Sequence, residues 1–207
     1  MDVLKRFEET SALLEGHFVL SSGLHSPKYL QCALALQHPE DASLFGREIA
    51  DRVRTGSGSD WVPPDIDTVA SPAIGGLIIG YATAQALRKR FIWTERENGV
   101  MTLRRGFSVA RGERILVVED VITTGGSTRE CIAVLESRGA KVIAAASIID
   151  RSNGRADVEV PRIALVSFDV PSYQPNVCPM CALGIEAVKP GSRTRAKMST
   201  SFDGIET

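Results

Sequence analysis

Two adjacent carboxylates, Glu119 and Asp120, follow an aliphatic run directly and precede a turn rich in threonine and glycine. Carboxylates at the end of a strand accept hydrogen bonds from diol hydroxyls, or hold a hydrated Mg²⁺ through water. The turn, residues 123–128, offers hydroxyls and backbone N–H groups at the start of a predicted helix, where the helix dipole favours an anion. Its glycines let a phosphate approach the backbone closely. The segment therefore suits a sugar that carries a phosphate.

A turn of this composition is also common as a plain strand-to-helix connection with a capping hydroxyl. The preceding Glu-Asp pair makes that interpretation the weaker one. The chain contains neither GxxxxGK[ST] nor a strand-linked GxGxxG. Both a P-loop NTPase and a dinucleotide-binding domain are therefore disfavoured.

Alternating strands and helices are expected to position these residues. Hydrophobic periodicity and near-continuous aliphatic runs predict helices at 3–14, 40–54, 76–90 and 127–138, and strands at 17–20, 28–32, 66–70, 91–94, 114–119, 142–149 and 162–168. Aliphatic strands separated by helices indicate a mainly parallel sheet covered on both faces. Ligands bind such sheets beyond the carboxyl ends of the strands, which is where the Glu-Asp pair falls. Residues 55–65 are predicted to form a loop.

The composition is that of a globular protein. The chain has 207 residues, of which 43% are hydrophobic and 24% charged, and its net charge is −1. This balance provides no global basic field for nucleic acid or an anionic membrane. We find neither a secretory signal nor an apolar run of about 18 residues, and we expect a cytoplasmic protein with no membrane and no nucleic-acid partner.

Several segments carry a resemblance to a known family. Residues 117–128, VVEDVITTGGST, closely resemble the phosphoribosyl-diphosphate (PRPP) signature of the type I phosphoribosyltransferases. Residues 18–29, FVLSSGLHSPKY, resemble the base-binding segment of the orotate phosphoribosyltransferases within that family. The Asp150-Arg151 pair and residues 178–193, which begin CPMC and contain KPGSR, also match that branch. The resemblance spans residues 3–193.

The resemblance implies an α/β fold of the type I phosphoribosyltransferase kind, with a central mainly parallel sheet flanked by helices and a small N-terminal hood. It implies one domain over residues 1–207, in which 1–37 and the part near 162–193 form or support a base-binding hood, followed by a polar tail at 197–207. The implied reaction joins orotate to PRPP, giving orotidine 5′-monophosphate and pyrophosphate in pyrimidine biosynthesis. Mg²⁺ is the implied cofactor, held by PRPP and water near the Glu-Asp pair rather than by direct protein ligands.

The family's site residues carry over onto matching positions. The implied PRPP contacts are Glu119, Asp120, Val121, Ile122, Thr123, Thr124, Gly125, Gly126, Ser127 and Thr128, together with Ala73, Gly75 and Gly76 in a pyrophosphate loop. The implied orotate contacts are Thr123, Arg151, Ser21, Ser22, Gly23 and His25. A planar guanidinium such as that of Arg151 suits bidentate pairing with a carboxylate.

A mobile lid is also implied, and here the chain departs from better-known members. Their lid contains a lysine and a histidine, whereas residues 94–107 contain neither, and Gly75 takes a position where many members have lysine. The available cations are Arg96, Arg104 and Arg105, which with Asp120 are the predicted catalytic residues. Arginine suits phosphate oxygens but cannot act as a general acid near neutral pH. The alternative is a solvated charged hairpin. In the family this lid reaches the partner subunit, so a homodimer is implied.

The signature leaves two alternative functions: transfer to another base, or a regulator that senses PRPP. A further alternative is a bifunctional protein in which this domain is fused to the next enzyme of the pathway. We do not expect a second catalytic domain within 207 residues.

The four cysteines are too few and scattered for a disulfide framework. Cys178 and Cys181 form a single CxxC far in sequence from any histidine, whereas zinc needs four ligands. We therefore expect a surface turn with reduced thiols, with a metal shared across a dimer or a redox pair as the alternatives. His17 and His38 are expected to be structural.

Overall fold

A computed structural model describes residues 2–20, 22–56 and 65–190 of the chain. Its elements, in chain order, are α1 (Val3–Glu9), β1 (Leu13–Val19), β2 (His25–Leu30), α2 (Cys32–Leu36), α3 (Pro39–Thr55), β3 (Thr68–Pro72), α4 (Gly76–Leu87), β4 (Arg90–Glu97), β5 (Val100–Leu103), β6 (Arg114–Ile122), α5 (Gly126–Ser137), β7 (Lys141–Asp150), β8 (Arg162–Ser167), the 3-10 helix η2 (Pro175–Val177) and α6 (Pro179–Ala182). The predicted polar tail at 197–207 and most of the predicted loop at 55–65 lie outside the described residues.

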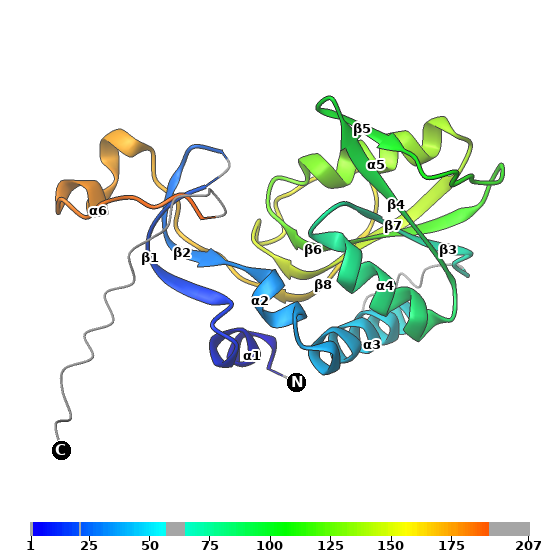
Figure 1. The fold of residues 1–207 in the computed structure, drawn as a ribbon, viewed down its shortest axis with the longest axis horizontal. Coiled ribbons are helices and arrows are strands. Elements are labelled where there is room, and N and C mark those ends of the chain that lie inside the picture. The colour runs from blue at the N-terminus through cyan, green and yellow to red at the C-terminus, as the bar shows by residue number, and fades with distance from the viewer. Residues whose placement is uncertain (1, 21, 57–64, 191–207) are drawn as a thin grey trace, which may run out of the picture.

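A six-stranded sheet in the order β5-β4-β3-β6-β7-β8 forms the centre of the molecule (Figure 1). Strands β4, β3, β6, β7 and β8 run parallel, and β5 pairs antiparallel with β4 at one edge. The predicted α/β fold with a mainly parallel central sheet is therefore confirmed. The β5 strand was not predicted, because four residues beyond a tight turn leave too short a pattern to recognise.

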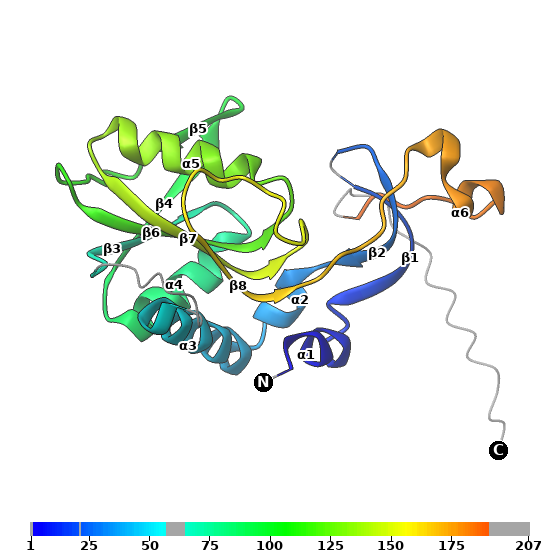
Figure 2. The same cartoon turned by 180° about the vertical axis from the view of Figure 1, so that it is seen from behind.

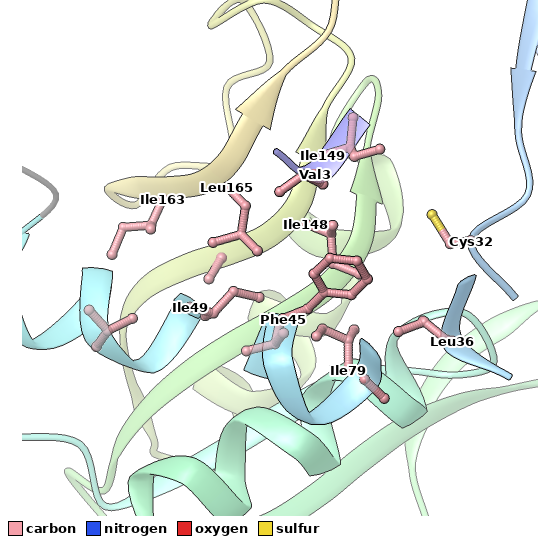
Figure 3. Close-up of a cluster of buried hydrophobic side chains, with 14 of the residues drawn as sticks. Val3, Cys32, Leu36, Phe45, Ile49, Ile79, Ile148, Ile149, Ile163 and Leu165 are labelled. Atoms are coloured by element: carbon pink, nitrogen blue, oxygen red, sulfur yellow. The ribbon is translucent and has the colours of Figure 1, made fainter. Parts of the chain in front are cut away.

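Helices cover both faces of this sheet, with α3 and α4 on one side and α5 on the other (Figures 1 and 2). Figure 3 shows the larger core cluster, in which Phe45 and Ile49 of α3 lie near Ile79 of α4. Ile148 and Leu165 of the sheet belong to the same cluster. Because the sheet is buried on both faces, its strand ends are held rigidly enough to orient side chains for chemistry.

A second, two-stranded sheet stands apart from the main one. In it β1 and β2 pair antiparallel, and the chain returns beside them after β8 (Figure 2). Val19 N–H donates to the Val188 carbonyl at 2.8 Å, and His25 and Tyr173 exchange two backbone hydrogen bonds at 2.9 and 2.8 Å. We call β1, β2 and residues 170–190 together the hood.

The predicted helix over residues 3–14 is wrong beyond α1. The chain leaves the helix at Thr10, and Ser11 has a φ of 54°. Leu13 and Leu14 then pair with the β2 strand. The two leucines fit a helical stripe and a buried strand equally well, so periodicity could not separate these states, and pairing with β2 decided the outcome.

Several element ends also differ from the predictions, among them those of β6 and α4. Strand β6 continues to Ile122, so Glu119 and Asp120 lie within the strand and not after it. Helix α4 ends at Leu87 because Arg88 adopts a left-handed φ of 56°, and Arg90 already belongs to β4. Among the described residues, no helix combines the length and the apolar character needed to span a membrane.

Candidate active site

An open cavity of about 850 Å³ lies between the hood and the carboxyl ends of β6 and β7. This is the edge at which parallel sheets bind ligands. Its lining includes Leu20, Ser22, Leu24 and Tyr29 from the hood side and Asp120, Val121, Thr123, Thr124 and Arg151 from the sheet side. Residues about 100 positions apart in sequence therefore face one space.

The two carboxylates of β6 are the most constrained groups here. Glu119 is only 8% exposed, and Asp120 borders the cavity, with Oδ1 accepting the Val121 N–H at 2.8 Å. Burial raises the pKa of Glu119 well above its ordinary value, and the nearby Asp120 charge raises it further. Burial also raises the pKa of Asp120. Among the described residues no lysine or arginine forms an ion pair with either carboxylate, and Asp120 is the one of the two that lines the cavity.

The loop before α4 lies directly against these carboxylates. A Cβ added at Gly75 would fall 2.8 Å from both carboxylate oxygens of Asp120, and one at Gly76 would fall 2.8 Å from the Val118 carbonyl. Glycine is required at both positions for the backbone to come this close. The structure therefore brings the predicted pyrophosphate loop, with its cis peptide bond between Ala73 and Ile74, to the Glu-Asp pair.

The turn after β6 leads into an uncapped helix. Gly125 has a φ of 75°, and no side chain caps the N-terminus of α5. The N–H groups of this first turn are therefore available to an anion at the positive end of the helix dipole. Arg129 holds the turn in place, since its guanidinium donates to the Thr124 carbonyl at 3.0 Å and to the Asp157 carbonyl.

Arg151 is one of two arginines among the described residues that line the cavity, the other being Arg155. Arg151 follows β7, its backbone N–H donates to the Ile122 carbonyl at 2.8 Å, and its Nε is buried without a hydrogen-bond partner. Burial lowers the pKa of Arg151. Asp150 fixes the loop that carries Arg151 by accepting backbone N–H groups from Ser152 at 2.8 Å and Gly154 at 3.0 Å. A buried, partnerless guanidinium N–H indicates a site for an anionic acceptor.

Some of the predicted orotate contacts do not meet in this cavity. The His25 ring faces His17 and Cys181 instead, with Nδ1 2.7 Å from His17 Nε2. Ser22 borders the cavity and Gly23 forms the adjoining turn at a φ of 81°. Ser21 lies outside the described residues. Tyr29, Asp169, Val170 and Ser172 also line the cavity. They lie in the two segments expected on the base side, but none of them was predicted as a contact, because tertiary folding decides which side chains of a segment face the cavity.

The three predicted lid arginines lie on the β4–β5 hairpin or just beyond it, and none borders the cavity of its own chain. Arg96 pairs with Glu130 of α5 at 2.7 Å. Arg104 pairs with Glu97 at 3.2 Å, and Nε and Nη2 of Arg105 donate to the two carboxylate oxygens of Glu95 at 3.1 and 3.0 Å. In this conformation the predicted lid is a charged hairpin, and each of its three arginines forms an ion pair with a glutamate.

Comparisons with known proteins agree with this geometry. Residues 47–172 match the family described as Phosphoribosyl transferase domain. The chain is 52% identical over 192 residues to the orotate phosphoribosyltransferase of Pelotomaculum thermopropionicum, covering 93% of this chain and 97% of that one. It is 50% identical over 186 residues to that of Thermotoga maritima, covering 90% and 95%. The solved orotate phosphoribosyltransferase of Aeropyrum pernix superposes with a TM-score of 0.63 at 27% identity, over 80% of this chain and 93% of that one.

The fold and the site define a type I phosphoribosyltransferase, with the Glu-Asp pair in the last residues of β6 and the uncapped α5 turn after it. Within that class, the chain belongs to the orotate phosphoribosyltransferase family.

Proposed function

We infer that the chain transfers the 5-phosphoribosyl group of PRPP to orotate, forming orotidine 5′-monophosphate and pyrophosphate. The observation that carries the inference is the cavity itself, which is lined by the Asp120 carboxylate and by Arg151, whose Nε is buried without a hydrogen-bond partner. The carboxylates suit ribose hydroxyls, and a buried guanidinium suits the carboxylate of orotate. A neutral base would leave that cation without a partner.

We assign the binding roles from this layout. Glu119 and Asp120 accept the ribose hydroxyls, the turn from Thr123 to Thr128 binds the 5′-phosphate, and residues 73–76 bind pyrophosphate. Arg151 and the backbone near Ser22 and Gly23 hold orotate. His25 is left out of this assignment, because its ring points away from the cavity.

The chemistry follows from those positions. As the bond from ribose C1 to pyrophosphate breaks, positive charge builds on the sugar, and the ring nitrogen of orotate forms the new bond to C1. The nearby carboxylates stabilise that charge, and no protein nucleophile is needed. The site must also exclude water, which would otherwise hydrolyse the activated sugar.

The carboxylate pair also fits a requirement for Mg²⁺. Oxygen ligands suit this cation, which keeps most of its own water shell. Burial raises the pKa values of Glu119 and Asp120, so a nearby cation would stabilise their charged forms. We propose that both residues hold Mg²⁺ through water beside PRPP. Bound there, the cation neutralises charge on the pyrophosphate.

A panel of bases tests the assignment. Purified protein is incubated with PRPP, Mg²⁺ and orotate, adenine, hypoxanthine, uracil or xanthine, and pyrophosphate release is measured. We expect release with orotate alone, abolished when Mg²⁺ is chelated. Release with another base would overturn the orotate assignment, and PRPP binding without release with any base would favour a regulator.

Gly75→Ala is expected to lower kcat/KM for PRPP by about 10-fold or more. The added methyl meets the Asp120 carboxylate at 2.8 Å, so either Asp120 or the loop must move, and misplaced reacting groups are costly. Gly75 is exposed, so thermal stability is expected to change little. Steady-state kinetics with varied PRPP, alongside a melting curve, check this. Unchanged kinetics would show that the loop and Asp120 do not act together.

We propose a homodimer in which each lid serves the partner's cavity. The lid arginines do not border the cavity of their own chain. Ile74, Ile78 and Tyr81 lie on one face of the α4 region, 84%, 49% and 61% exposed. Such an apolar face next to an active-site loop suits a second copy of the chain.

Subunit complementation tests the shared lid. Asp120→Asn and the double variant Arg104→Ala/Arg105→Ala should each be nearly inactive alone. Mixed after reversible dissociation, they should regain up to about a quarter of wild-type activity per total site, because one of the two sites in each mixed dimer is intact. Native mass spectrometry, which resolves the mass difference between the two variant subunits, verifies the mixed dimer. A mixed dimer without regained activity would contradict the shared lid.

We further propose that residues 1–207 form a single catalytic domain with residues 1–37 and 162–193 supporting the base side. The four cysteines form no disulfide, which suits the cytoplasm as the compartment.

A further inference from the structure

Four side chains that can bind a metal meet in the hood, outside the cavity. His17 of β1, His25 at the start of β2, and Cys178 and Cys181 near α6 each place one ligand atom within 4.8 Å of the other three. None of the four borders the cavity. The expected surface turn is wrong for Cys178, which is 2% exposed. The long sequence separation from the histidines disappears when the C-terminal segment folds back onto the hairpin.

The distances within this cluster approach those of a tetrahedral site. Cys178 Sγ lies 3.5 Å from His17 Nε2, and Cys181 Sγ lies 3.8 Å from that atom and 3.3 Å from His25 Nδ1. Zinc bonds of about 2.0–2.3 Å at tetrahedral angles separate sulfur and nitrogen ligands by about 3.5 Å. The two ring nitrogens are 2.7 Å apart, and an ion between them requires an opening of about 0.6 Å.

The tautomer of His17 is set by a backbone contact. Its Nδ1 lies 2.7 Å from the Ile185 carbonyl oxygen, so Nδ1 must carry the hydrogen that it donates. Nε2 then directs a lone pair at the two thiols. A metal-binding histidine characteristically donates its other ring N–H to a carbonyl or carboxylate, which orients the ring. His17 is 3% exposed, so this ring is held inside the hood.

The hood has little else to hold it together. None of the residues of α6 is buried, and Leu183, Ile185 and Val188 are among the exposed large apolar side chains. Small units with so little core typically need a disulfide or a metal ion. The segment is attached to the hairpin mainly at Tyr173 and Val188, on either side of the cysteines.

We propose that His17, His25, Cys178 and Cys181 bind one structural Zn²⁺ that fastens the C-terminal segment to the β1–β2 hairpin. Two thiolates and two imidazoles in a tetrahedral arrangement are the ligand set that selects zinc among the common divalent ions. Four protein ligands leave no open position, so the ion is structural. Because Leu20, Ser22 and Leu24, between β1 and β2, line the cavity, the ion also supports the base side; this last consequence rests on the proposed function.

Metal content is the first test. The full chain, expressed in zinc-supplemented medium and purified without chelators, should contain about one zinc per chain by mass spectrometry of the metal. Replacement by Co²⁺ should give the intense visible spectrum of a tetrahedral site with thiolate ligands. Less than about 0.1 zinc per chain and no such cobalt spectrum would overturn the proposal.

Single variants locate the ion. Cys178→Ser, Cys181→Ser and His17→Gln should each lose most of the zinc. Cys131→Ala and His38→Gln, a cysteine and a histidine outside the cluster, should retain it. Zinc retained at full stoichiometry in Cys178→Ser would overturn the assignment.

A measurement on the wild-type chain keeps the proposal testable if the variants do not fold. A mercurial reagent should release one zinc per chain as Cys178 and Cys181, identified by peptide mapping, are modified. Removal of zinc should also speed hydrogen exchange at the Val19 and Val188 amides, and raise the KM for orotate more than it lowers kcat. A Cys178–Cys181 disulfide in metal-free protein isolated without reductant would identify a redox pair and overturn the zinc site.

Discussion

Asp120→Asn should lower kcat/KM for PRPP by about 10²-fold or more without destabilising the free protein. A hydrogen bond to a charged group contributes about 1.5–3 kcal/mol, and Asp120 is proposed both to accept a ribose hydroxyl and to stabilise the cationic sugar. Asparagine keeps the shape but removes the charge. Steady-state kinetics with varied PRPP and a thermal melt of the ligand-free protein measure the two effects.

The stability half of this prediction follows from the pKa shifts. The pKa values of Glu119 and Asp120 are raised in the folded chain, so folding favours their protonated forms. Their contribution to the free energy of unfolding therefore falls as pH rises from the ordinary carboxyl pKa through the raised values. At neutral pH, removing one of the two charges should leave the melting temperature unchanged or raise it.

Measuring stability over a series of pH values tests whether the effect is specific to the buried Asp120 carboxylate or follows from the loss of any carboxylate. The loss of stability with rising pH should be smaller in Asp120→Asn than in the wild type. Asp51→Asn, at an exposed carboxylate of α3 paired with Arg54, serves as the control and should keep the wild-type profile. A lower melting temperature together with full activity in Asp120→Asn would mean that the carboxylate is structural.

Arg151→Gln should raise the KM for orotate by about 10²-fold while changing the KM for PRPP much less. The Arg151 Nε is buried without a partner, and removing one member of a desolvated charged pair costs about 2–5 kcal/mol. Arg151→Lys should recover only part of the loss, because an ammonium cannot form two parallel hydrogen bonds to a carboxylate. Initial rates measured with each substrate varied in turn give the two KM values separately and check this difference.

Arg155→Gln provides the matched control. Arg155 also borders the cavity, but its guanidinium is exposed and lies 3.4 Å from Asp169. We expect at most a small change in the KM for orotate, since an exposed ion pair contributes little. Equal effects of the two variants, or a rise only in the KM for PRPP, would contradict the proposal that Arg151 binds orotate.

Much of the main sheet could be predicted from sequence because each of its parallel strands is a local signal. A strand buried on both faces is a short aliphatic run, and residues 114–119 and 142–149 show this without any knowledge of their neighbours. The start of α5 was equally visible, since a glycine turn and its helix follow each other directly. The edge strand β5 and helix α2 are too short for a period to be recognised.

The hood was less predictable because its contacts join distant segments. Leu13 and Leu14 fit a helix until β2 pairs with them. His25 lies in a loop that resembles a base-binding segment, yet its ring packs against His17 and Cys181. Backbone pairing decided both outcomes, and pairing partners far apart in the chain leave no mark on local periodicity.

The sequence by itself determined the parallel sheet, the Glu-Asp pair with the glycine-rich turn that follows it, and the family, because these depend on neighbouring residues along one strand and one helix. Only the tertiary structure placed Gly75 against Asp120, left the Nε of Arg151 buried without a partner, and gathered two histidines and two cysteines in one cluster. Those arrangements depend on how elements far apart in sequence pack together. This packing is decided by the burial of their hydrophobic faces in a shared core, which involves the whole chain.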